Sequence, residues 1–175
     1  MRATHLIVTI TFVLMSYVSV QAKTVLDYYC LIPDEFFQCE DDVKITRNYK
    51  LNQIKYKNIK AGYIRAESER NPMEVALFKD IKSNKDVVAV NIKCGPGCMC
   101  NRFALLQFDA NGKAINITAS IFPNENLIWK KIKRTDVDAY EFILPEVGTT
   151  IKVVHADTGE ELAQIFWRDG KFVLQ

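Results

Sequence analysis

The sequence lacks a strong net charge and is poor in glycine and proline. Among its 175 residues, 23 Lys and Arg face 21 Asp and Glu, so the net charge of +2 gives the chain as a whole no electrostatic preference for nucleic acid or anionic membranes. Seven Gly and five Pro, with no internal repeat, exclude collagen-like, repeat and low-complexity disordered chains. The hydrophobic share of 49% instead predicts a folded globular protein.

Motifs of catalysis and of nucleotide binding are absent too. No Gly-x-Gly-x-x-Gly or Gly-x-x-x-x-Gly-Lys loop occurs, so no nucleotide cofactor is expected. None of the few serines lies in Gly-x-Ser-x-Gly, the turn that exposes the nucleophile of many hydrolases. Of the two histidines, His155 lies beside a Thr158-Gly159 turn with acidic neighbours, where a solvated turn is the expected role. The sequence indicates no reaction and no cofactor, and we expect a protein that is not an enzyme.

Long hydrophobic runs are confined to the first 22 residues. After the basic Arg2, residues 6–18 are apolar and uncharged, and Val20-Gln21-Ala22 offers the small residues that a signal peptidase reads. We therefore predict a signal peptide over residues 1–22 and a periplasmic or secreted protein. The alternative is an uncleaved membrane anchor, although the run is shorter than the ~20 residues that a membrane-spanning helix needs. After cleavage no stretch is apolar enough for an integral membrane protein.

The remaining residues, 23–175, contain no linker and are expected to form one domain rich in β-strands. Turn signals at Asn111-Gly112, Thr158-Gly159 and Asp169-Gly170 favour tight hairpins, because Gly and Asn tolerate the positive φ that such turns require. The predicted strands are nine short runs rich in Ile, Val, Phe and Tyr, namely 59–66, 74–78, 86–92, 103–108, 114–119, 140–144, 150–155, 161–167 and 172–174.

Helix signals are few. Pro33 followed by two acidic residues favours a short helix over 33–39, since proline costs nothing in a first helical turn and carboxylates suit the helix amino terminus. Asn124 can cap one or two helical turns within 124–134, and residues 43–51 are ambiguous between helix and strand. The predicted fold class is α+β, a curved, meander-rich antiparallel sheet with one or two short helices on one face.

Several short motifs occur in a fixed order along the chain. The most distinctive are Cys94-Gly95-Pro96-Gly97-Cys98 and Trp167-Arg168-Asp169-Gly170-Lys171-Phe172. They are accompanied by the strings IPDEFF at 32–37, IKAGYI at 59–64, EVALFK at 74–79 and LPEVGTTI at 144–151. Together they resemble small exported bacterial proteins of unknown function that carry a CGPxC-type loop and a C-terminal hairpin of this kind. The resemblance implies a periplasmic or secreted setting and implies no active site.

Five cysteines follow the predicted signal peptide, and export would place them where disulfides form. Five is an odd number, so two bridges would leave one thiol, and the pairing stays open. Gly95-Pro96-Gly97 can turn tightly enough to join Cys94 to Cys98, and Cys30 and Cys39 bracket the turn after Pro33. Alternatively, Cys94, Cys98 and Cys100 could hold copper or zinc, or could carry thiol–disulfide chemistry.

One stretch is both basic and rich in tyrosine. Residues 43–66 contain no acidic residue, and such a stripe can engage an anionic surface, unless it is a solvated face balanced by its acidic flanks. Its candidate surface-binding residues are Lys44, Arg47, Lys50, Lys55, Lys57, Lys60, Arg65, Tyr49, Tyr56 and Tyr63. Because export argues against nucleic acid, we expect a non-enzymatic binding domain whose partner is an unknown protein or an anionic envelope surface. The alternative function is the metal or thiol chemistry of Cys94, Cys98 and Cys100.

Overall fold

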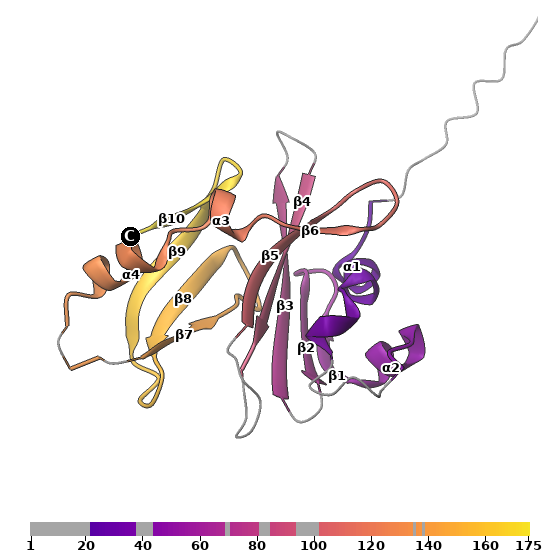
Figure 1. The fold of residues 1–175 in the computed structure, drawn as a ribbon, viewed down its shortest axis with the longest axis horizontal. Coiled ribbons are helices and arrows are strands. Elements are labelled where there is room, and N and C mark those ends of the chain that lie inside the picture. The colour runs from indigo at the N-terminus through magenta and orange to yellow at the C-terminus, as the bar shows by residue number, and fades with distance from the viewer. Residues whose placement is uncertain are drawn as a thin grey trace, which may run out of the picture.

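The computed structural model describes residues 22–37, 44–68, 71–80, 85–93, 102–134, 136–137 and 139–175. It confirms the α+β class: antiparallel strands form a six-stranded and a four-stranded sheet, accompanied by short helices (Figure 1). The predicted sheet is therefore divided into two. The predicted signal peptide, apart from Ala22, lies outside the described residues.

The six-stranded sheet is an antiparallel meander in the order β1-β2-β3-β4-β5-β6. Its strands are β1 (Ile54–Asn58), β2 (Tyr63–Ser68), β3 (Asn71–Asp80), β4 (Lys85–Ile92), β5 (Arg102–Phe108) and β6 (Ala114–Asn116). The strand predicted over 59–66 begins only at Tyr63, because residues 59–62 form the turn that joins β1 to β2. Gly62, with φ of 79°, completes that turn. The sequence analysis did not predict β1, because most of its residues are polar.

The four-stranded sheet confirms the predicted meander of the last third of the chain. Its order is β10-β9-β8-β7, with β7 (Tyr140–Ile143), β8 (Thr150–His155), β9 (Glu161–Arg168) and β10 (Lys171–Leu174). The turn between β9 and β10 is the one predicted: Asp169 and Gly170 both have positive φ, 49° and 76°. Two successive residues of positive φ match the right-handed twist of a tight hairpin.

Short helices flank the sheets: α1 (Val25–Leu31), the 3-10 helix η1 (Asp34–Phe36), α2 (Arg47–Asn52), α3 (Thr118–Ile121) and α4 (Glu125–Ile132). Asn124 caps α4 as predicted, its side-chain oxygen accepting from the N–H of Leu127 at 3.0 Å. The helix expected over 33–39 is the shorter η1. The strand expected over 114–119 ends at Asn116, since that side chain accepts from the N–H and hydroxyl of Thr118 and turns the chain into α3.

The six-stranded sheet is covered on both faces. On one face, α1 and η1 bury Tyr29 and Phe37 against strand residues such as Val88. On the other face, Phe78 and Leu105 pack in one cluster with the inner residues of the four-stranded sheet. Because β4 is covered on both faces, it is an almost continuous apolar run rather than an alternating one. The molecule therefore has three layers, helices, a central sheet and a second sheet (Figure 1).

Hydrogen bonds join the two sheets at the outer edge of β7. Asn91 of β4 donates to the backbone oxygen of Phe142 at 2.7 Å, and Glu74 of β3 accepts from the N–H of Leu144 at 3.2 Å. Tyr63 orients that carboxylate by donating to it at 2.8 Å. These side chains satisfy backbone groups of β7 and of Leu144, which directly follows it, along what would otherwise be an open sheet edge. They also fix β7 next to β4, where the candidate site lies.

Candidate functional site

A cavity of about 580 Å³ opens where β7 and α4 meet strands β4 and β5 of the central sheet. Residues from both sheets line it. Five of its lining residues are aromatic: Phe103, Phe122, Trp129, Tyr140 and Phe142. This cavity is here called the inter-sheet pocket.

Local geometry explains why the aromatic side chains converge. Tyr140 and Phe142 are two residues apart in β7, so they lie on the same face of the strand. Glu125 and Trp129 are four residues apart in α4, so they share one face of the helix. The rings of Trp129 and Tyr140 meet edge to face, with centroids 4.9 Å apart, and the ring of Phe122 stands at 88° to that of Phe142. The pocket thus offers both faces and edges of aromatic rings.

The charges of the pocket are unequal. Lys93 and Glu141 neutralise each other through an ion pair of 3.0 Å. Glu125 accepts a hydrogen bond from the indole N–H of Trp129 at 3.3 Å and forms no ion pair with another described residue. Burial, and secondly the nearby Glu125 carboxylate, raise the pKa of Tyr140 to about 12. The uncompensated charge of the pocket is therefore a carboxylate beside two aromatic rings, an arrangement that attracts cations.

Two residues of the predicted basic stripe are core residues. Lys50 is only 5% exposed, and its ammonium pairs with Asp34 at 2.8 Å, donates to the backbone oxygen of Ile32, and lies 4.9 Å from the ring centroid of Phe37. Tyr63 is buried between the sheets. Neither is available to a partner at the surface.

The other residues of the stripe do not form one uniform face. Lys55 pairs with Glu67 at 3.0 Å, and the guanidinium of Arg65 lies over the ring of Tyr56. Tyr49 is half-buried in α2. Apart from Lys55 and Arg65, the exposed basic residues are distributed over the segment before α2, α2 itself, β1 and the following turn, at Lys44, Arg47, Lys57 and Lys60.

The predicted cysteine chemistry falls almost wholly outside the described residues. Cys30 lies in α1, half-buried, and its thiol is free in the structure. Its expected partner, Cys39, and the loop cysteines Cys94, Cys98 and Cys100 lie outside the described residues, so the two bridges and the metal set stay predictions. Within the described ranges, no group of three His, Cys, Asp or Glu side chains could hold a metal ion.

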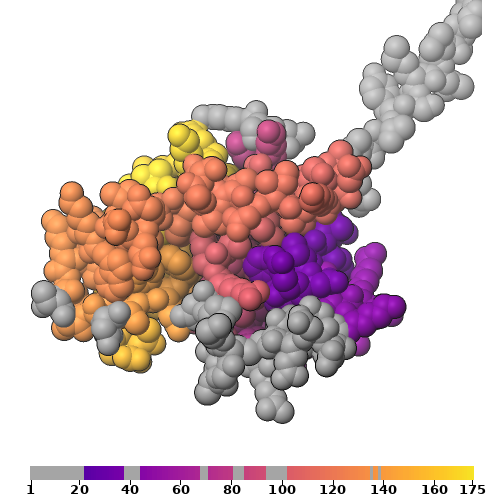
Figure 2. Space-filling model, in the orientation of Figure 1, coloured from indigo at the N-terminus to yellow at the C-terminus, as the bar shows by residue number. Residues whose placement is uncertain are grey.

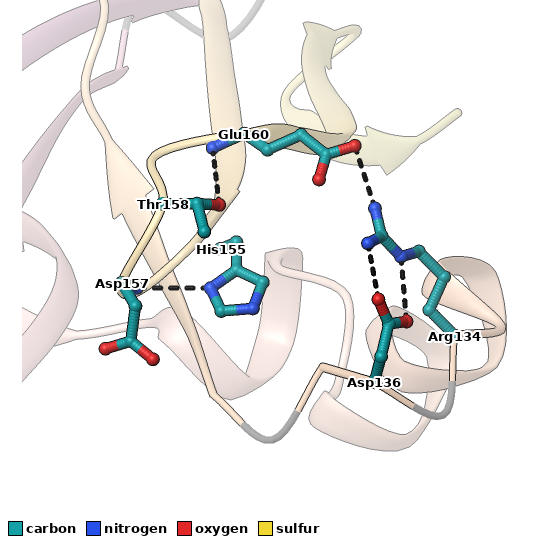
Figure 3. A network of polar contacts seen from close by, with 6 residues as sticks. All are labelled: Arg134, Asp136, His155, Asp157, Thr158 and Glu160. Atoms are coloured by element: carbon teal, nitrogen blue, oxygen red, sulfur yellow. Dashed lines mark hydrogen bonds and ion pairs between the residues drawn. The ribbon is translucent and has the colours of Figure 1, made fainter.

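His155 belongs to a polar network that anchors the end of α4 (Figure 3). The expected solvated turn was wrong for this side chain, which is only 9% exposed and accepts from the N–H of Asp157 at 3.1 Å. Beside it, Arg134 bridges Asp136 at 2.7 Å and Glu160 at 2.8 Å, and its hydrogen bond lowers the pKa of Asp136 to about 2. The network ties the residues after α4 to the β8–β9 turn and so helps to hold α4 over the pocket.

Comparison with protein-family models, with curated proteins and with solved structures finds no match for this chain. Among the described residues no helix is both long and apolar enough to span a bilayer.

Sequence reasoning missed the inter-sheet pocket. Its residues were noticed only as strand and helix formers, although the spacings of Glu125 with Trp129 and of Tyr140 with Phe142 were visible. Those spacings predict shared faces but not that the two faces meet. The two faces meet because β7 packs against β4, a strand about 50 residues earlier in the chain. Such a long-range contact has no local signal in the sequence.

Proposed function

We propose that this protein is a non-enzymatic binding protein that acts after export, in the periplasm or outside the cell, and that the inter-sheet pocket binds a small organic cation. The observation that carries the proposal is an aromatic cavity whose uncompensated charge is the carboxylate of Glu125. Export rests on the apolar run at residues 6–18 and the small residues that follow it.

The chemistry of the lining selects the ligand class. An ammonium or quaternary ammonium group is attracted to the face of an indole or phenol ring by about 0.5–2 kcal/mol, the larger value applying when water is excluded. Trp129 and Tyr140 supply such rings, and Glu125 adds direct charge attraction. The volume of about 580 Å³ suits a small molecule, since such sites commonly span ~300–1,000 Å³.

Tryptophan fluorescence tests the proposal, because Trp129 lines the pocket whereas Trp167 packs against Phe78 and Phe172 instead. Choline should change the emission of a Trp167→Phe variant, and its neutral carbon isostere, dimethylbutanol, should bind more weakly. Glu125→Gln should weaken choline binding about fivefold, equivalent to about 1 kcal/mol.

The matched control is Glu35→Gln, the same chemical change at an exposed position of η1. It should leave choline binding unchanged. Equal affinity for choline and for its neutral isostere would contradict the assignment of a cation site.

The disulfides remain part of the proposal for the exported protein. Two bridges, Cys94 with Cys98 and Cys30 with Cys39, would leave Cys100 as the one titratable thiol of the denatured, unreduced chain. Metal binding by Cys94, Cys98 and Cys100 would instead leave at least these three thiols titratable once the metal is removed. A thiol titration together with the zinc and copper content of the purified protein separates the two.

A further inference from the structure

The four-stranded sheet has one edge that is covered and one that is open. Side chains of Asn91 and Glu74 cover β7, as described above. At the opposite edge, β10 pairs with β9 alone among the described strands. A strand with unpaired backbone groups is a template for pairing with another strand.

The register shows which backbone groups of β10 point outward. The N–H of Gln175 donates to Gln164 of β9 at 2.9 Å, and in an antiparallel pair successive residues alternate between facing the neighbouring strand and facing away. The N–H and C=O of Leu174 and Phe172 therefore point away from β9. Trp167, the residue of β9 opposite Phe172, confirms this register. Its N–H donates to Thr149 on the other side of β9, so the backbone groups of this opposed pair do not face each other.

A groove of about 640 Å³ runs beside this edge, between β10 and the α3–α4 segment. In Figure 2 the orange α4 region and the yellow C-terminal strands lie together at the end of the molecule opposite the indigo α1. The groove has apolar lining, and two of its large apolar side chains are unusually exposed, Leu127 at 51% and Val173 at 42%.

The rim of the groove carries charge of one sign. Its lysines are Lys130, Lys131, Lys133 and Lys171, and the residues that line the groove include no Asp or Glu. None of the four lysines forms an ion pair with another described residue. The rim is therefore complementary to an acidic partner.

We propose that the edge of β10 binds an extended acidic segment of another protein, which adds to the sheet as a further strand. Phe172 is buried, so the half-buried Leu174 would offer its outward N–H and C=O to the backbone of that segment, and the lysines would pair with its carboxylates. A lipid offers no ladder of backbone groups. A second copy of this chain would bring two lysine rims together, and like charges would oppose that contact. The groove shares Phe122 and Pro123 with the lining of the inter-sheet pocket, but this proposal does not depend on cation binding there.

Substitution of Leu174 tests the backbone pairing. Leu174→Pro removes the outward N–H, whereas Leu174→Ala removes the side chain and keeps the N–H. Both changes remove the leucine side chain, which packs against the core cluster between the sheets, so thermal unfolding should be nearly the same in the two variants. A short fluorescein-labelled peptide of alternating Glu and Val should bind Leu174→Ala about tenfold more tightly than Leu174→Pro, as judged by anisotropy.

The lysine rim is tested with a double variant, Lys130→Gln with Lys131→Gln. It should weaken peptide binding about tenfold at low salt, and added salt should weaken binding to the unsubstituted protein in the same direction. Lys44→Gln with Lys57→Gln, at exposed positions elsewhere, is the control and should have no effect.

Three results would overturn the proposal. Equal peptide binding by Leu174→Pro and Leu174→Ala would exclude strand addition. Binding of phosphatidylglycerol vesicles through the same lysines, without peptide binding, would assign the groove to a lipid surface. A dimer in sedimentation that Leu174→Pro disrupts would assign the edge to a second copy of the chain.

Discussion

At the scale of single residues, the buried polar side chains carry the most specific information. Lys50 belongs to a basic stretch for which the sequence predicts surface exposure, yet its side chain is buried. The backbone oxygens at the end of α1 need hydrogen-bond donors, and the ammonium of Lys50 supplies them. The ammonium donates to the oxygens of Cys30 and Ile32 and pairs with Asp34. A buried charge is tolerated only when it is paired in this way. Nothing in the residues around Lys50 in the sequence indicates such a role, since its partners lie about 20 residues away.

Lys50→Met should therefore destabilise the protein. Methionine preserves most of the side-chain volume but leaves the buried oxygen of Ile32 without its lysine donor, which we expect to cost about 1–3 kcal/mol of the free energy of unfolding. Lys57→Met, at an exposed position of β1, should change that free energy by less than about 0.5 kcal/mol. Urea denaturation measures both. A more stable Lys50→Met protein would mean that burying the charge costs more than its contacts contribute.

At the scale of elements, local signals were sufficient where a turn or a cap dictated the structure. The Asp169-Gly170 hairpin and the Asn124 cap were predicted because their backbone requirements are met by particular residue types. α1 was missed although it has such a signal: Thr24 accepts from the N–H of Asp27, and Asp27 accepts from the N–H of Thr24 at 2.8 Å. The apolar run after Thr24 had hidden this capping box.

Thr24→Ala should destabilise α1 by about 1 kcal/mol, since it removes the side-chain half of the cap. Thr24→Ser keeps the hydroxyl and should preserve most of the stability. The hydrogen bonds from Thr24 lower the pKa of Asp27 below its usual value near 4. The folded-state pKa is below the unfolded one, so this contribution is complete above the unfolded pKa and is lost as the pH falls through the folded pKa. The effect of Thr24→Ala on urea denaturation should accordingly shrink at acidic pH, and an effect that persists unchanged there would argue against the capping box.

At the scale of the whole molecule, the two-sheet arrangement had no sequence signal of its own. Strand runs and hairpins predict a meander, but whether the strands form one sheet or two depends on which of their faces are buried against each other. The continuous apolar run of β4 was the one indication that the central sheet is covered on both faces. The inter-sheet pocket and the open edge of β10 both follow from this packing, which is why neither could be predicted from the sequence.

Burial of tyrosines across the layers predicts a loss of stability in alkali. Burial, and then a hydrogen bond to Asp86, raise the pKa of Tyr28 to about 12, and burial also raises the pKa values of Tyr29 and Tyr63. Because these folded-state values exceed the unfolded value near 10, the stabilisation is complete below pH ~10 and is lost as the pH rises toward ~12. Tyr28→Phe should flatten this loss in urea denaturation between pH ~10 and ~12. An unchanged slope would mean that Tyr28 does not contribute to it.

The most direct test of the cation site locates the ligand by nuclear magnetic resonance. Intermolecular nuclear Overhauser effects from the trimethylammonium protons of choline should reach the ring protons of Trp129 and Tyr140, because those rings flank Glu125 in the inter-sheet pocket. At the same choline concentration the effects should be weaker in Glu125→Gln, in keeping with its about fivefold lower affinity. Contacts from bound choline to other parts of the protein, with none to Trp129 or Tyr140, would contradict the account.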